Sequence, residues 1–282
     1  MKNISFGQYY PAESIIHKLD PRSKVIFTVL YIVCSFLCKN ILSFAALILF
    51  SAFIVILSQI PFKTLFRSIK PLIIIMVFMS FLNLFMTQGG LVIFELGIIK
   101  ITSKGIYAAA SAVVRVVSLV IGTSIFLTYT TTPISLTDGL ESLLSPLKKF
   151  KVPVHEIAMM MSIALRFIPI LMEETDKIMK AQIARGADFE SGNIIKKAKA
   201  LVPLLVPLFI SAFRRANDLA MAMEARCYRG GDGRTKMKPL IYKKADSVGY
   251  SVLALYLLVC LSIGKITQVL FGILLGLMMA IG

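Results

Sequence analysis

The sequence predicts an all-α, polytopic membrane protein with about six transmembrane helices and a cytoplasmic module of long amphipathic coupling helices. Hydrophobic residues make up 57% of the 282 residues and charged residues only 16%. The mean hydropathy is +0.82, a value that soluble domains of this size rarely reach. Several apolar runs approach the ~20 residues that cross a bilayer, and between them lies a basic stretch with apolar residues at helical spacing.

Residues 1–130 are predicted to form an N-terminal membrane region of four spans. The apolar runs that define these spans are residues 25–38, 41–60, 71–86 and 105–130. Only Lys39 and Asn40 separate the first two runs, so these should form a tight helical hairpin. Residues 61–70 are interpreted as a short basic loop, and residues 87–104 as an extended loop or an interfacial segment. The fourth run is rich in small residues, Gly122 among them, which allow close helix packing in lipid.

A different pattern begins at residue 131 and predicts a cytoplasmic coupling-helix module over residues 131–245. Charged and apolar residues recur there at helical spacing, and the predicted helices are residues 135–147, 154–187 and 194–228. A helix of thirty residues is about 45 Å long, which suits a lever or strut better than a compact soluble core. Residues 246–282 are predicted to return to the membrane as a C-terminal region of two spans, 248–263 and 269–281.

The formal net charge is +16, and the positions of the basic residues decide whether nucleic acid or a membrane is the expected partner. Most of the excess lies in residues 148–244, next to apolar runs, and an excess of Lys and Arg beside spans marks the cytoplasmic side. We therefore expect a multi-pass protein of a bacterial-type cell membrane, in contact with membrane lipid, with both termini inside. Nucleic acid is not expected as a partner, because neither aromatic–basic interleaving nor zinc-ligand spacing accompanies the charge.

No catalytic, cofactor-binding or metal-binding residues are predicted. The cysteines form no CxxC pair, and the histidines His17 and His155 stand far apart without an HExxH motif. The glycine-rich residues 230–236 lack the spacing of a phosphate-binding loop. The chain is therefore not expected to be an enzyme.

Two predicted helices end in the same way, with an arginine that follows an alanine. An arginine at a helix end is a planar, permanent cation that can dock into an acidic groove with several hydrogen bonds. The alternative interpretation is a cation that caps the helix dipole, with a glycine as the left-handed stop. The repetition of the pattern favours docking, and the predicted docking residues are Ala184, Arg185, Gly186, Ala225 and Arg226.

On these residues the chain resembles the transmembrane T component (EcfT, CbiQ-like) of energy-coupling factor transporters. Residues 17–24 (HKLDPRSK) resemble the family's N-terminal signature, residues 166–169 (RFIP) its mid-module stretch, and the two arginine tips its coupling motifs. Cys227 stands where the family commonly has glycine. The resemblance implies that a pair of ABC-type ATPase subunits binds the tips and hydrolyses ATP, while a separate S component binds the substrate, a vitamin or a metal ion.

Three questions stay open at this point. Arg115 lies within a predicted span, where an ionisable group is costly, and the sequence names no partner for it. Methionines crowd the coupling module, which suits either a surface that repacks against changing partners or ordinary helix packing. A stand-alone secondary transporter with a large cytoplasmic regulatory module is the alternative function, although no inverted repeat is visible.

Overall fold

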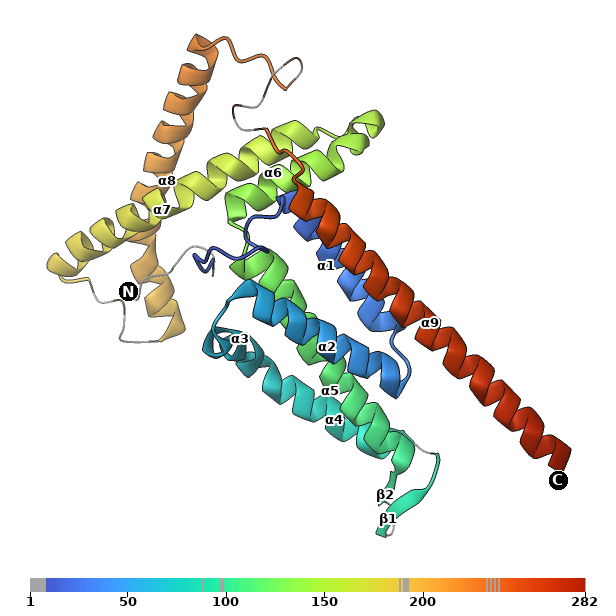
Figure 1. The fold of residues 1–282 in the computed structure, drawn as a ribbon. Coiled ribbons are helices and arrows are strands. Elements are labelled where there is room, and N and C mark those ends of the chain that lie inside the picture. Colours follow the sequence, from blue (N-terminus) through green and yellow to red (C-terminus); the bar gives the residue numbers. More distant parts are fainter. Residues whose placement is uncertain are drawn as a thin grey trace. The chain divides into compact units, whose positions relative to one another are not determined.

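The structure is a computed structural model that describes residues 9–281, apart from residues 88, 97–98, 188, 190–192, 232, 234, 236 and 238. The described chain is almost entirely helical, and the predicted all-α, polytopic membrane class is confirmed (Figure 1). The α-helices are α1 (Pro21–Leu37), α2 (Ile41–Ser58), α3 (Phe62–Ile69), α4 (Ile73–Met86), α5 (Ser103–Thr123), α6 (Pro133–Leu144), α7 (Val154–Ala184), α8 (Ile194–Ala225) and α9 (Lys244–Ile281). Short helices η1 (Lys70–Leu72), η2 (Ser124–Tyr129) and η3 (Ser145–Phe150) and a hairpin of β1 (Val92–Leu96) and β2 (Ile99–Thr102) complete them.

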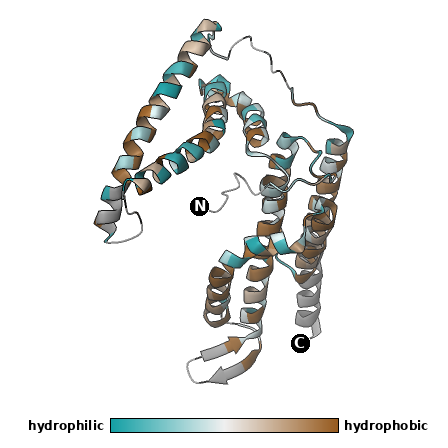
Figure 2. Cartoon of the chain, turned by 90° about the vertical axis from the view of Figure 1, so that its left-hand side faces the viewer, coloured by the Kyte–Doolittle hydropathy of each residue, from teal (hydrophilic) through white to brown (hydrophobic). Residues whose placement is uncertain are grey.

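The chain divides into two compact units. The first unit comprises Met1–Leu140 and Leu240–Gly282, and the second comprises Glu141–Pro239. Within the described residues, the segments long and apolar enough to cross a membrane are Ile41–Ser58, Phe62–Met86, Ser103–Tyr129, Val154–Ala184 and Lys244–Ile263. Figure 2 shows nearly continuous hydrophobic colour along α4, whereas α7 and α8 alternate hydrophilic and hydrophobic turns.

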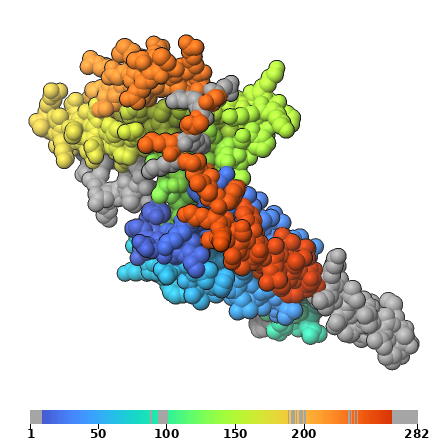
Figure 3. Space-filling model, turned by 45° about the horizontal axis from the view of Figure 1, so that its top comes forward, coloured from blue at the N-terminus to red at the C-terminus, as the bar shows by residue number. Residues whose placement is uncertain are grey.

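Helix α1 is the centre of the first unit, packed against α5, η2 and α9. Figure 3 shows α9 lying lengthwise along the N-terminal helices. The ring of Tyr31 on α1 is fully buried, and its hydroxyl donates to the Ser118 carbonyl of α5 at 3.0 Å and pairs with Ser51 Oγ of α2 at 2.8 Å. A buried hydroxyl needs such partners, so this residue fixes three helices relative to one another.

Two connections differ from the sequence prediction. Residues 62–69 form helix α3 rather than a basic loop, because Leu65 faces the core while Lys63 and Arg67 occupy another side. The segment between α4 and α5 forms an antiparallel hairpin in which Glu95 lies opposite Lys100. Alternating apolar residues there fit the period of a strand.

The C-terminal part also differs from the prediction of two spans. Helix α9 runs for 38 residues without a break, a length of about 57 Å. The polar interruption that suggested two spans contains Gly264 and Lys265 but no proline. A single glycine costs a helix only about 1 kcal/mol, so the helix continues through it.

The second unit is built around α7 and α8, which have 31 and 32 residues and cross each other (Figure 1). Pro169 lies inside α7, and Pro203 and Pro207 lie inside α8, yet both helices continue through these positions. The two helix ends that carry the predicted docking residues belong to this unit.

Candidate functional site

The end of α7 is a Schellman motif centred on Arg185. Arg185 is the C-cap residue, and Gly186 follows with a φ of +87°. The Gly186 N–H donates to the Ile183 carbonyl at 2.9 Å, and the Ala187 N–H donates to the Gln182 carbonyl at 3.0 Å. These two bonds satisfy the last carbonyls of the helix, so the chain turns away sharply just after the arginine.

The end of α8 repeats this geometry with a different residue at the left-handed position. Arg226 is the C-cap residue, and Cys227 follows with a φ of +56°. The Cys227 N–H donates to the Glu224 carbonyl at 2.8 Å, and the Tyr228 N–H donates to the Met223 carbonyl at 3.0 Å. The two tips therefore share one backbone motif, although only the first has the glycine that this motif favours.

All five predicted docking residues, Ala184, Arg185, Gly186, Ala225 and Arg226, are exposed. Within the described part of the chain, neither arginine side chain makes a hydrogen bond or an ion pair. A small alanine precedes each arginine, so little side-chain bulk stands beside the guanidinium. Each tip thus presents a planar cation whose five donors are available to a carboxylate-rich surface.

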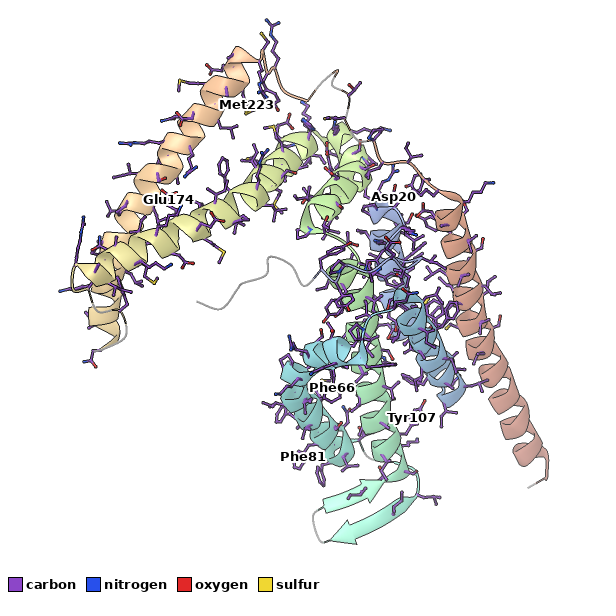
Figure 4. The ribbon with its side chains drawn as sticks, turned by 60° about the vertical axis from the view of Figure 1, so that its left-hand side comes forward. Asp20, Phe66, Phe81, Tyr107, Glu174 and Met223 are labelled. Carbon is purple, nitrogen blue, oxygen red and sulfur yellow. The ribbon has the colours of Figure 1, made fainter. Side chains whose placement is uncertain are left out.

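The crossing of α7 and α8 sets where the tips lie on the second unit. Arg215 Nη2 of α8 donates to Glu174 Oε2 of α7 at 3.1 Å. Figure 4 places Glu174 near the crossing and Met223 close to the far end of α8. The adjoining groove between the helices is apolar, with Phe167 of α7 and Leu219 of α8 among its lining residues. Sequence reasoning did not find this pair, because the partners lie on different helices.

The chain beyond the second tip returns to the start of α7. A Cβ added at Gly231 would lie 2.3 Å from His155 Cδ2, so the glycine backbone packs directly on the imidazole. His155 Nδ1 in turn lies 2.8 Å from Glu141 Oε1. By contrast, nothing described lies within 4 Å of a Cβ added at Gly186.

The N-terminal signature forms a buried polar cluster in the first unit. The Asp20 carboxylate caps α1 and accepts from the Arg22 backbone N–H at 2.9 Å and from the Arg22 side chain at 3.0 Å. Burial by itself raises the pKa of the Asp20 carboxyl, but these hydrogen bonds and the nearby positive charges outweigh it and hold the pKa below its usual value. Lys24 Nζ donates to the Thr130 carbonyl at 2.7 Å, and Asp246 Oδ1 accepts from the Asp20 N–H at 2.9 Å.

Asp246 is the member of this cluster that sequence reasoning missed. It is 1% exposed, and its second oxygen accepts from the Lys243 N–H at 2.7 Å. The signal in the sequence that could have indicated its role was a single acidic residue at the start of an apolar run. Its effect is to join the start of α9 to the N-terminal signature, which lies more than two hundred residues earlier.

Arg115, whose partner the sequence could not name, supports the turn between α1 and α2. Its Nη2 donates to the Cys38 carbonyl at 2.9 Å, and its guanidinium carbon lies 5.4 Å from the Phe44 ring centroid. The Tyr107 hydroxyl of the same helix donates to the Lys39 carbonyl at 2.8 Å. Arg115 therefore caps the end of α1, where a cation complements the helix dipole.

The described residues contain no group of three or more His, Cys, Asp or Glu side chains that could hold a metal ion. Of the four cysteines, Cys34, Cys38 and Cys260 are buried and Cys227 is exposed. Among the methionines of α7 and α8, Met160, Met161 and Met221 are exposed. These exposed thioethers fit the predicted repacking surface, which stays a prediction.

Comparison with known proteins gives consistent similarities over most of the chain. Residues 12–237 match the profile of the CbiQ family, described as cobalt transport protein. The chain is 55% identical to the energy-coupling factor transporter transmembrane protein EcfT of Thermosediminibacter oceani over 250 residues, which cover 89% of this chain and 94% of that protein. It is 53% identical to the EcfT of Clostridium kluyveri, covering 93% and 97%, and 51% identical to that of Bacillus subtilis, covering 88% and 93%.

Proposed function

The chain belongs to the CbiQ family, as a transmembrane component of an energy-coupling factor transporter, and from this premise we propose that it couples ATP hydrolysis to uptake. In this role it transmits motion from a pair of ABC-type ATPase subunits to a substrate-binding S component. The S component takes up a vitamin or a metal ion. The chain itself carries out no catalysis, and the proposed ATPase-docking residues are Ala184, Arg185, Gly186, Ala225 and Arg226.

The observation that carries the proposal is the repeated geometry of the two tips. Two long helices of one unit end in the same Schellman motif, and each C-cap is an exposed arginine without a partner in the described residues. One such arginine is explained by favourable capping of the helix dipole. Two of them on crossing helices suit a two-pronged contact with a paired receptor, because each ATPase subunit then receives one cation.

The mechanism requires that the tips sense a change in the ATPase pair. Binding of ATP draws the two subunits together, and the docked tips follow. The helices α7 and α8, joined at Glu174 and Arg215, convert this displacement into a change of the angle or position of the pair. A partner drives such a change only through its different affinity for the two states, so the tips must bind one state of the ATPase pair more tightly.

The proposal assigns residues 1–130 and 246–282 to the membrane and residues 131–245 to the cytoplasm. Helix α7 is apolar enough in its first half to be counted among possible spans. Its second half carries Glu173, Glu174, Asp176, Lys177 and Lys180, and charges at the centre of a bilayer cost several kcal/mol each. An interfacial or cytoplasmic position avoids that cost.

Co-purification of this chain with its ABC ATPase subunits in mild detergent tests the docking residues. Arg185→Ala or Arg226→Ala is expected to weaken retention of the ATPases, because each removes one charge-assisted contact worth about 2–5 kcal/mol at a buried interface. The double substitution is expected to abolish retention and ATP-dependent uptake.

Lys177→Ala on α7 and Arg214→Ala on α8 are the matched controls, since both remove exposed cations from the same helices seven or more residues before their ends. Retention of the ATPases by the double tip variant at the control level would refute the docking assignment. Uptake by the wild-type chain alone in liposomes, without nucleotide, would support a secondary transporter instead.

A further inference from the structure

Helix α3 has three distinct sides. Leu65 faces the core and is 4% exposed, whereas Phe62 and Phe66, four residues apart, are 75% and 63% exposed. Lys63 and Arg67 of α3 and Lys70 at the start of η1 recur at intervals of four and three residues and form a third side, on which all three are exposed. An exposed aromatic side next to a basic side is the pattern of a helix that lies in a membrane interface.

The cations of α3 have no acidic partner. The described residues form no ion pair with Lys63, Arg67 or Lys70, and no Asp or Glu occurs between Asp20 and Glu95 in the sequence. Helix α3 joins α2 to α4 at the end of the first unit opposite to the hairpin of β1 and β2 (Figure 1). An excess of cations at a connection between spans marks its cytoplasmic side.

An apolar groove begins beside α3. Its volume is about 430 Å³, and it is open on one side, a size within the range of ligand pockets. It is lined by Ile48, Ser51, Ala52, Val55 and Ile56 of α2, Phe62 of α3, and Val113, Val114, Val117, Ser118 and Ile121 of α5. Eight residues along either helix correspond to a length of about 12 Å, enough for much of an acyl chain.

We propose that α3 and this groove form a binding site for an anionic phospholipid of the cytoplasmic leaflet. The groove takes an acyl chain, Phe62 and Phe66 lie among the upper parts of the chains, and Lys63, Arg67 and Lys70 bind the phosphate. Hydrogen bonds hold α3 against the rest of the first unit, because Tyr129 Oη of η2 donates to the Thr64 carbonyl at 3.1 Å and contacts Ser68 Oγ. The proposed lipid site therefore has a defined position on the unit. Figure 4 labels Phe66 on α3 and Phe81 on α4, and these side chains are 63% and 58% exposed.

Charge selects a lipid over an apolar protein helix as the occupant. A partner helix would fill the groove but would leave the three cations unpaired. An anionic lipid fills the groove with an acyl chain and also pairs its phosphate with the cations. Each cation near an anionic headgroup surface strengthens binding about fivefold, so three cations together give on the order of a hundredfold preference for an anionic lipid over a zwitterionic one.

The chain contains no tryptophan, so an introduced tryptophan can serve as a fluorescent reporter in the first experiment. Phe66→Trp gives a single fluorescent reporter in the full-length chain, reconstituted in nanodiscs of phosphatidylcholine with or without phosphatidylglycerol. Emission is expected to be blue-shifted and to be quenched most strongly by lipids brominated near the headgroup. Phe81→Trp on α4 is the reference, quenched most strongly by lipids brominated deeper in the chain. Emission of the Phe66→Trp chain at the position of tryptophan in water, unquenched by either lipid, overturns the proposal.

The second experiment measures the phosphatidylglycerol retained per chain after purification from mixed-lipid nanodiscs into mild detergent. The triple variant Lys63→Gln, Arg67→Gln, Lys70→Gln is expected to lose the retained anionic lipid. The control triple variant Lys39→Gln, Lys100→Gln, Lys104→Gln removes the same charge from the other end of the first unit and is expected to retain it.

The groove is tested separately with Val117→Phe, whose larger side chain fills it. Retained lipid is expected to fall at least fivefold, whereas Ala110→Phe, at an exposed position of the same helix outside the groove, keeps the wild-type level. Equal retention by the cation variant and its control overturns the site. A Phe66→Trp reporter that responds only when the other transporter subunits are added assigns the surface to a protein partner and also overturns it.

Discussion

The two arginine tips differ at the residue that follows the C-cap. Gly186 and Cys227 both occupy the left-handed region, with φ of +87° and +56°. A side chain in that region costs roughly 1–2 kcal/mol, and glycine avoids the cost. The second tip therefore keeps the same geometry as the first at the expense of local strain.

This difference predicts opposite effects for two reciprocal substitutions. Cys227→Gly is expected to stabilise the chain by about 0.5–1 kcal/mol, because relief of strain exceeds the greater flexibility of unfolded glycine. Gly186→Cys is expected to destabilise it by a similar amount, since no described atom lies near the added Cβ and only the backbone conformation matters. Thermal unfolding in detergent measures both, and a higher midpoint for Gly186→Cys would contradict a shared motif.

At the scale of elements, α1 inserts aromatic rings into glycine positions of its neighbours. A Cβ added at Gly122 of α5 would lie 2.2 Å from Tyr31 Cε1, and one added at Gly249 of α9 would lie 2.8 Å from Phe27 Cε2. Phe27 and Tyr31 are four residues apart and so share one face of α1. The small residues that suggested close packing in the sequence thus accept rings from a neighbouring helix.

Gly122→Ala is expected to lower the free energy of unfolding by about 1–3 kcal/mol, since the added methyl group displaces the Tyr31 ring. Displacement also strains the bonds of the Tyr31 hydroxyl to Ser118 and Ser51. Thermal unfolding in detergent tests this, with Ala110→Val at an exposed position of α5 as the control. If Tyr31→Leu in the same chain restores no stability to Gly122→Ala, the ring is not the obstacle.

The crossing of α7 and α8 depends little on its ion pair. The Arg215 side chain is 41% exposed and that of Glu174 is 24% exposed, and solvent screens such pairs to about 0.2–1 kcal/mol. Apolar contacts from Phe167 and Leu219 contribute more to the adhesion of the helices.

At the scale of the whole molecule, the exposed cysteine reports the side of the membrane on which the second unit lies. Cys227 is the exposed member of the four cysteines, and it lies in the region that we assign to the cytoplasm. An impermeant maleimide is expected to label the chain, expressed without partner subunits, in inside-out vesicles and not in right-side-out ones. Cys227→Ser is expected to abolish the label.

Leu91→Cys in the Cys227→Ser background provides the opposite control. Leu91 is 81% exposed at the start of the hairpin, which joins α4 to α5, and it is expected to be labelled only in right-side-out vesicles. Labelling of Cys227 from the outside would contradict the assignment of residues 131–245 to the cytoplasm.

The sequence by itself determined the membrane class, the long helices and the ends at Arg185 and Arg226. These features are local, because hydropathy, helical period and terminal residues act within one segment. Only the tertiary structure decided that Asp246 joins the N-terminal signature, that Arg115 caps α1, and that Glu174 meets Arg215. Each of these contacts joins residues far apart in the chain, and their partners depend on packing that no single segment encodes. The same holds for the helical form of residues 62–69, where packing of Leu65 into the core outweighed the local polar signals.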